Sequence, residues 1–272
     1  MAKRLTIADL LALRGTRQLS MLRVETLDEA EAAERAGIDM ISAPIELHEA
    51  GLRRVAPTVF TFPNLTYGVD FVEDDCVRMA FRGLRAGGDA IYCAARTQTI
   101  RRLAEEGIPV CGHVGLIPSK ATWTGGFRAV GKTLASAKLI WRQIRALEDA
   151  GAFAAEIEVV PEAIAAEIAR KTSLFLVSMG GGSFGHAQYL FSEDVLGANT
   201  GHVPRHAKTY RNFAAEFARL QAERIAAYGE FAADVTSGAY PAAAHKVPVE
   251  RETVAAFRDW LDAQPRGGGA DD

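Results

Sequence analysis

The feature that most restricts the fold of this chain is a regular alternation of short apolar runs with amphipathic helical patterns. Parallel strands buried on both faces are apolar throughout, and a helix connects each to the next. About eight such units predict a closed (β/α)₈ TIM barrel rather than an open doubly wound sheet. The expected strands are Leu19–Val24, Asp39–Ala43, Thr58–Phe62, Ala90–Cys93, Pro109–Cys111, Ala155–Val160, Leu174–Ser178 and Val195–Asn199.

The last third of the chain shows helical patterns, at Tyr210–Tyr228 and Arg251–Ala263, with no strand between them. We expect extra C-terminal helices within a single barrel domain over residues 1–265. Residues 266–272 are rich in glycine and predict a disordered tail.

Composition narrows the class of function. The 272 residues are 49% hydrophobic with a net charge of −3, which favours neither nucleic acid nor an anionic membrane surface as a partner. No apolar run approaches the roughly 20 residues that span a bilayer. Three cysteines without metal-type spacing indicate free thiols in a reducing compartment. We therefore expect a cytoplasmic protein.

In a TIM barrel the active site lies at the carboxyl ends of the strands. Polar or glycine-rich positions at the expected strand ends are therefore the candidates for function. They are Glu46, His48, Thr61, Asn64, Tyr92, Cys93, His113, Glu158, Ser178, the Gly180–Gly182 loop and His202.

Glu158 and His113 are the strongest catalytic candidates. A carboxylate inside an apolar strand is costly unless it is paired, hydrogen-bonded or protonated, and a general base is one use for it. His113 follows the fifth strand in Gly112-His113-Val114-Gly115, where the glycines allow close approach. The alternative for Glu158 is a structural ion pair inside the barrel. The alternative for His113 is a ring that only forms a hydrogen bond with a backbone carbonyl.

Two further segments allow binding or purely local roles. Glu46 and His48 lie close together in sequence and offer metal ligands, or else belong to a solvated loop. Gly180 and Gly181 could cradle an anion with backbone N–H groups, or simply form a turn after the strand.

Several motifs resemble those of the ketopantoate hydroxymethyltransferase (3-methyl-2-oxobutanoate hydroxymethyltransferase) family. The resemblance covers most of residues 15–247. Its motifs are Pro109–Thr133, Leu147–Ala152, Glu158-x-x-Pro161, Thr200–Pro204 with Ala207-Lys208, Ser237–His245 and Ala36–Ile41.

That resemblance implies a barrel of the phosphoenolpyruvate/pyruvate superfamily type, assembled as a homo-oligomer, in this family a decamer. It implies Mg²⁺ or another divalent cation that holds a small 2-oxo acid. A glutamate, here Glu158, removes the C3 proton, and the enolate attacks methylenetetrahydrofolate. His113 matches the active-site histidine.

Other motif positions depart from the family. Its G-D-S motif becomes Pro44-Ile45-Glu46, the aspartate of A-D-x-P becomes Thr61, and K-x-E becomes Tyr92 and Ala94. An enolate needs a compensating charge. The candidates are His113 as imidazolium, Arg96, or a rebuilt metal site of Glu46, His48 and His113. The expected substrate-binding residues are Tyr92, Thr61, Glu46, Arg96, Ser178, Gly180, Gly181 and His202.

These observations predict an enzyme that makes or breaks a C–C bond beside the carbonyl of a small 2-oxo acid through an enolate, with one-carbon hydroxymethyl transfer as the expected reaction. A divergent lyase acting on another small acid is an alternative. A non-catalytic barrel that binds a small acid or a partner subunit is another.

Overall fold

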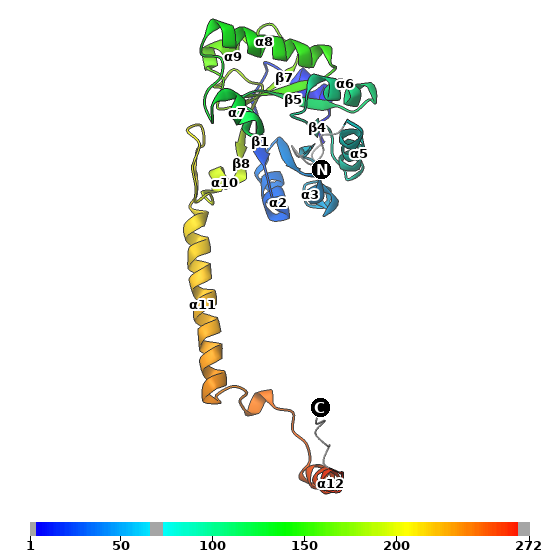
Figure 1. The fold of residues 1–272 in the computed structure, drawn as a ribbon, viewed down its shortest axis with the longest axis vertical. Helices are drawn as coiled ribbons and strands as arrows, with labels where there is room; N and C mark the ends of the chain where they lie inside the picture. Colours follow the sequence, from blue (N-terminus) through cyan, green and yellow to red (C-terminus); the bar gives the residue numbers. More distant parts are fainter. Residues whose placement is uncertain (1–3, 66–72, 266–272) are drawn as a thin grey trace, which may run out of the picture. The chain divides into compact units, whose positions relative to one another are not determined.

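Eight parallel strands pair in chain order and close into a barrel, with β8 beside β1 (Figure 1). The computed structural model describes residues 4–65 and 73–265. The (β/α)₈ fold expected from the alternation is confirmed. The strands are β1 (Leu19–Arg23), β2 (Met40–Pro44), β3 (Phe60–Asn64), β4 (Ile91–Tyr92), β5 (Val110–Gly115), β6 (Ala154–Glu158), β7 (Phe175–Met179) and β8 (Ala187–Phe191).

Helices surround the strands (Figure 1). Thr26 shows how the sequence begins one of them: its side chain accepts a hydrogen bond from the Glu29 N–H, and Gly37 ends the helix with φ 77°, a conformation that glycine adopts without strain. The helices of the barrel are α1 (Ile7–Ala12), α2 (Leu27–Ala36), α3 (Ile45–Glu49), α4 (Leu52–Val55), α5 (Glu73–Arg85), α6 (Thr97–Glu105), α7 (Ala121–Thr124), α8 (Leu134–Asp149), α9 (Glu162–Ala169) and α10 (Ser192–Leu196).

The chain divides into two compact units, Met1–Ala214 and Ala215–Asp272. The first contains the barrel, and α11 (Phe213–Ser237) begins at its end. The second contains most of α11 and all of α12 (Arg251–Asp262). The single domain over 1–265 stays a prediction, and the expected tail lies outside the described residues. Within the described ranges, none of the helices is long and apolar enough to cross a membrane.

Alternate strand residues fill the interior of the barrel. Met21 pairs with Met40, and Met40 with Phe60, and all three belong to one buried interior cluster. The residues between them pack outward against the helices. Side chains two apart on a strand share a face. The same alternation therefore decides which residues at the carboxyl ends of the strands point into the barrel.

The eighth strand lies earlier in the chain than expected. Ala187–Phe191 pairs with β1 along its whole length, whereas the predicted strand Val195–Asn199 covers the end of α10 and the turn that follows. Glu193 and Asp194 stand in the first turn of α10, and Gly197 ends it with φ 67°. Those are helix signals, and they account for the correction.

Candidate active site

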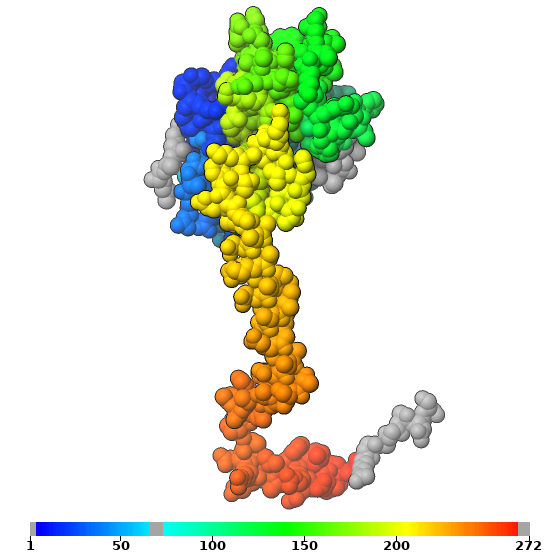
Figure 2. Space-filling model, turned by 90° about the vertical axis from the view of Figure 1, so that its left-hand side faces the viewer, coloured from blue at the N-terminus to red at the C-terminus, as the bar shows by residue number. Residues whose placement is uncertain are grey.

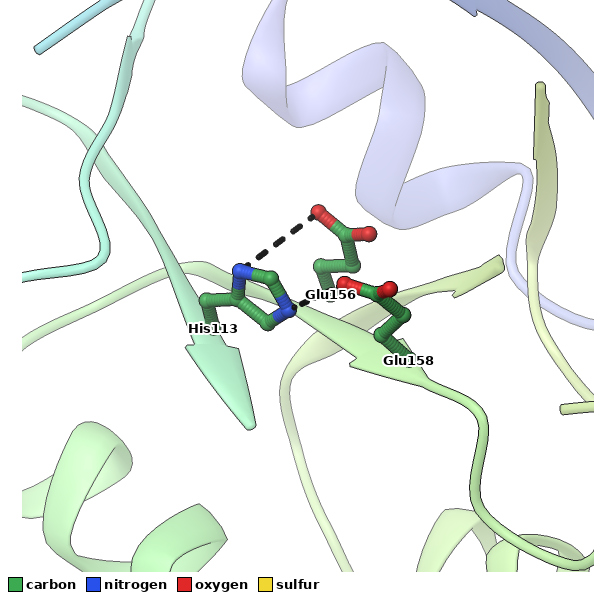
Figure 3. Close-up of side chains that lie close together, drawn as sticks. All are labelled: His113, Glu156 and Glu158. Carbon is green, nitrogen blue, oxygen red and sulfur yellow. Dashed lines mark ion pairs between the residues drawn. The ribbon is translucent and has the colours of Figure 1, made fainter. Parts of the chain in front are cut away.

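Four polar side chains meet inside the barrel at the carboxyl ends of β4, β5 and β6. This His113 cluster consists of Tyr92, His113, Glu156 and Glu158. His113 pairs with Glu156 in the strand register, and Glu158 lies two residues further along the same face of β6. Figure 3 shows both carboxylates turned toward the ring of His113. The side chains of His113, Glu156 and Glu158 are 4%, 2% and 8% exposed, so the charges lie away from bulk water.

Hydrogen bonds fix the His113 ring from both sides. The Tyr92 hydroxyl lies 2.5 Å from Nδ1 of His113 and donates to Oε2 of Glu156 at 2.6 Å. On the other side, Nε2 lies 3.0 Å from the carbonyl oxygen of Leu116 and 3.1 Å from Oε2 of Glu158. Nδ1 is also within 4.0 Å of Glu156 Oε2. The orientation of the ring is therefore set before a ligand binds.

The backbone around Glu158 is tightly constrained. A Cβ on Gly115 would lie 2.2 Å from the carbonyl oxygen of Glu158, and the Leu116 N–H donates to that oxygen at 2.9 Å. The next residue, Val159, has φ 49°, which is rare for a β-branched side chain. Its N–H and C=O bond to Met179 and Val130. Strain held in place by neighbours is typical of functional sites.

Burial and mutual charge shift the cluster's protonation equilibria. Burial disfavours a charged His113, but the Glu156 and Glu158 carboxylates outweigh it and raise the pKa of His113. Burial also raises the pKa of Glu156, against the opposing effect of His113. Burial and the Glu156 charge raise the pKa of Tyr92 well above its ordinary value, so its hydroxyl keeps its hydrogen.

A second group of polar side chains lies at the ends of β1, β2, β3 and β8. The hydroxyls of Ser42 and Tyr189 are 2.7 Å apart. With the Asn64 amide nitrogen donating to the Phe62 carbonyl, its oxygen accepts from both Ser42 and Arg23. The positive charge of Arg23 acts on Glu156. Arg23 is thus a cation at the rim of the barrel, beside the His113 cluster.

A pocket of about 870 Å³ opens over Glu158 at the ends of β6, β7 and β8. Gly180, Gly181 and His202 line it together with His206. The face that carries α10 and the segment after it is drawn in yellow in Figure 2. Burial lowers the pKa of His206, opposed by the nearby Glu158 carboxylate. The pocket therefore offers a base and imidazole groups to one ligand.

Comparison with known proteins shows which family the chain belongs to. The family model for ketopantoate hydroxymethyltransferase matches residues 45–243. The chain belongs to the ketopantoate hydroxymethyltransferase family. The 3-methyl-2-oxobutanoate hydroxymethyltransferase of Kosmotoga olearia is 31% identical over 263 residues, covering 87% of this chain and 95% of its own. That of Thermotoga neapolitana is 31% identical over 267 residues, covering 89% and 96%.

Solved structures share the fold at low sequence identity. A phosphonopyruvate hydrolase solved with oxalate and Mg²⁺ aligns with a TM-score of 0.51 and 15% identity, covering 95% of this chain and 97% of its own. A 2,3-dimethylmalate lyase of the PEP mutase/isocitrate lyase superfamily aligns with a TM-score of 0.50 and 12% identity, covering 96% and 98%. These matches show that the chain shares the (β/α)₈ fold of both proteins.

The divalent cation that the ketopantoate hydroxymethyltransferase resemblance implies does not fit this chain. Divalent cations take oxygen, nitrogen or sulfur ligands, but the motif positions hold Ile45, Thr61 and Ala94. Ile45 is buried among apolar side chains, and Thr61 Oγ1 is bonded to Arg53 and Asp89. The Ala94 carbonyl accepts from Lys120. Each position is committed to another contact.

His113, Glu156 and Glu158 are close enough in space for a metal, because their ligand atoms lie within 4.8 Å of one another. The hydrogen bonds argue against that use. Nε2 faces the Leu116 carbonyl oxygen, so it carries a hydrogen and has no free lone pair. Nδ1 is in contact with the Tyr92 hydroxyl. The group is therefore a hydrogen-bonded cluster and not a set of free metal ligands.

The metal set expected from sequence, Glu46, His48 and His113, is not brought together. Among the described residues its members form no group of neighbouring ligand atoms. Glu46 is exposed on α3. His48 is buried, with Nδ1 3.0 Å from the Pro44 carbonyl oxygen. Glu46 and His48 lie on the short helix α3 that follows β2, and their side chains point away from the barrel axis. The spacing of these residues in the sequence did not reveal this direction.

The expected substrate-binding residues divide into two sets. Gly180, Gly181 and His202 line the pocket, and Tyr92 contacts His113. Thr61 is bonded outside the barrel, because Phe60 and Phe62 take the inward positions of β3. Ser178 donates to the Gly182 carbonyl and holds the glycine loop. Arg96 is exposed and paired with Glu73 at 2.9 Å.

Sequence reasoning missed Glu156, Arg23 and His206 as site residues. Glu156 could have been found from its i, i+2 spacing to Glu158 on one strand, which places both on the same face. Arg23 ends the first strand, where a barrel presents its functional groups. His206 carried no such signal, since the loop after α10 reaches the pocket only through tertiary packing.

Proposed function

We propose that this protein forms a C–C bond beside the carbonyl of a small 2-oxo acid through an enolate, with hydroxymethyl transfer as the reaction. The observation that carries the proposal is Glu158, a buried carboxylate at the end of β6 that borders the pocket. Membership of the ketopantoate hydroxymethyltransferase family supports the reaction class. The activity for which these relatives are named supports 3-methyl-2-oxobutanoate as the acid.

In the proposed reaction Glu158 accepts the proton from C3 of the 2-oxo acid. The electrons of the broken C–H bond form the C2–C3 double bond, and the carbonyl electrons move to the oxygen. His113 lies beside Glu158 and orients it through the Nε2 contact. C3 of the enolate then forms a C–C bond with the methylene carbon of a one-carbon donor. Both C–N bonds of that carbon break, tetrahydrofolate leaves, and water supplies the oxygen of the new hydroxyl group. A pocket of about 870 Å³ is large enough for a 2-oxo acid and part of a second ligand, which supports methylenetetrahydrofolate as the donor.

Proton exchange tests the proposal without requiring the donor. The full-length protein is incubated with 3-methyl-2-oxobutanoate in D₂O, and loss of the C3 proton signal is followed by NMR. Glu158→Gln should lower the exchange rate about 10²–10⁴-fold, the usual contribution of a general base. Glu105→Gln, an exposed glutamate on α6, is the control. Wild-type protein without exchange on this or related 2-oxo acids, or unchanged exchange in Glu158→Gln, would overturn the proposal.

We also propose that the protein acts in the cytoplasm as a homo-oligomer, the family's decamer. Within the second unit, α11 and α12 carry exposed large apolar side chains, among them Phe217, Tyr228, Phe257 and Trp260. Exposed apolar patches of this kind mark contact surfaces. Sedimentation velocity on the full chain tests the assembly, and a monomer at micromolar concentration would contradict it.

A further inference from the structure

The hydrogen bonds around His113 restrict its hydrogens to a few arrangements, of which the ionised one comes first. Nε2 faces two oxygen atoms, those of Leu116 and Glu158, and therefore carries a hydrogen. On the other side, Nδ1 faces the hydroxyl of Tyr92. That hydroxyl has a single hydrogen, and it donates to Glu156. Its oxygen can then only accept, so Nδ1 must supply a hydrogen of its own.

A neutral His113 requires a different arrangement of the same protons. Glu156 would be protonated and donate to the Tyr92 oxygen, and Tyr92 would donate to Nδ1. The two arrangements differ by two short proton shifts, along contacts of 2.6 and 2.5 Å. No proton from solvent is needed, and Nε2 keeps its hydrogen in both. The charge on His113 is therefore coupled to the charge on Glu156 through Tyr92.

The surrounding charges favour the ionised arrangement. Glu158 faces Nε2 from β6, and its carboxylate stabilises a cationic ring. Arg23 from β1 stabilises an ionised Glu156. Tyr189 from β8 and Cys111 from β5 also face Glu156, but burial raises the pKa of both groups, so they remain neutral. Glu158 thus favours the cation on the His113 side and Arg23 favours the anion on the Glu156 side. Burial and the Glu158 charge act the other way on Glu156 and raise its pKa, and Arg23 also pairs with Glu25 at 2.6 Å.

We propose that Glu156, acting through Tyr92, holds His113 as an imidazolium beside Glu158. Glu156 and Tyr92 are then positioning residues, and the imidazolium is the protein's own cation at a site whose metal positions are Ile45, Thr61 and Ala94. The strand register supplies the arrangement, since Glu156 is paired with His113 on the neighbouring strand.

The catalytic use of this cation rests on the proposed function. When Glu158 accepts the C3 proton, its negative charge is lost and one negative charge appears on the substrate as the enolate. The number of negative charges in the site therefore stays the same throughout the step, with Glu156 ionised and the enolate in place of the Glu158 carboxylate. A fixed positive charge in a site away from water stabilises an enolate more than it would in water. His113 keeps both of its hydrogens, so it neither gains nor loses a proton.

The protonation state can be measured without turnover. Full-length protein with ¹⁵N-labelled histidine is titrated by NMR, and the His113 resonances are assigned by their loss in His113→Gln. We expect both ring nitrogens of wild-type His113 to remain protonated above the ordinary histidine midpoint of about 6.5. Glu156→Gln should lower the His113 midpoint by at least about one unit, and Glu105→Gln should leave it unchanged.

Tyr92→Phe removes the connecting hydroxyl while keeping the ring in place. It should also lower the His113 midpoint, and it provides an independent test where Glu156→Gln does not fold. Glu156→Asp should restore part of the wild-type midpoint. A neutral His113 in the wild type near pH 7, or a midpoint unaffected by Glu156→Gln and Tyr92→Phe, would overturn the inference. Absence of C3 exchange in a protein whose His113 is cationic would instead contradict the proposed function alone.

Discussion

Gly180 and His206 are in contact in a way that a side chain at position 180 would prevent. A Cβ built on Gly180 would lie 2.7 Å from Nδ1 of His206, on the wall of the pocket that Glu158 borders. The sequence suggested these glycines as an anion cradle or a turn. The structure shows a further role, because the absence of a side chain lets a histidine approach the base.

Gly180→Ala should displace His206 and impair catalysis. We expect kcat/KM to fall about tenfold or more, because small misplacements of positioned groups have large effects. Stability should fall by only about 1 kcal/mol, from the left-handed backbone at φ 64°. Gly37→Ala is a matched control, since Gly37 has φ 77° and nothing near its Cβ position. Equal activity in the two variants would show that His206 has no role.

Gly115→Ala should destabilise the barrel at the site itself. The new Cβ would lie 2.2 Å from the Glu158 carbonyl oxygen, and backbone atoms cannot move aside cheaply. We expect a loss of roughly 2–4 kcal/mol in the free energy of unfolding, from overpacking and backbone strain together. Chemical denaturation measures it. Gly107→Ala, with φ 75° and open space around the Cβ position, should lose only about 1 kcal/mol.

The contribution of His113 to stability should decrease as the pH rises through the neutral range. The folded-state pKa of His113 is raised, so the folded protein binds this proton more tightly than the unfolded chain does. The stabilisation is complete below the unfolded value of about 6.5 and is lost as the pH passes the folded pKa. Denaturation of wild type and His113→Gln between about pH 6 and pH 9 checks this. The wild type should lose more stability over that range, and parallel curves would contradict the shift.

Chelation should leave proton exchange at C3 intact. The motif positions for metal ligands hold Ile45, Thr61 and Ala94, and the His113 nitrogens are used in hydrogen bonds. We expect exchange rates before and after dialysis against EDTA to agree, with less than stoichiometric metal by elemental analysis. Exchange that disappears with EDTA and returns with Mg²⁺ would show that a cation binds elsewhere in the pocket.

Much of the architecture could be predicted because strands buried on both faces appear in the sequence as continuous apolar runs. Seven of the strands could be located because their apolar runs alternate with helical patterns that end at a glycine. Glu158 and His113 could be identified because they are polar residues at the ends of such runs. The eighth strand was misplaced because polar Gln188 interrupts Ala187–Phe191, while Val195–Asn199 is apolar at its start. Local hydrophobicity alone could not distinguish a short strand from the end of a short helix.

It was harder to predict which side chains of a strand point into the barrel and which point toward the helices. Thr61 was expected to bind substrate, but Phe60 and Phe62 point inward and turn Thr61 toward Arg53. Both faces of β3 are buried, so periodicity could not decide between them. Glu156 was overlooked for the related reason that only its pairing with His113 gives it meaning. The register between neighbouring strands depends on how the whole barrel closes. The sequence of one strand therefore does not show which residue lies opposite it.

The left-handed backbone at Val159 has a consequence for how this protein could be engineered. A valine at φ 49° costs about 1–3 kcal/mol, and glycine would relieve that cost. The hydrogen bonds to Met179 and Val130 hold this strained backbone directly after Glu158. A laboratory selection for heat resistance alone would therefore have a physical reason to sample Val159→Gly, because glycine keeps the left-handed backbone without its strain.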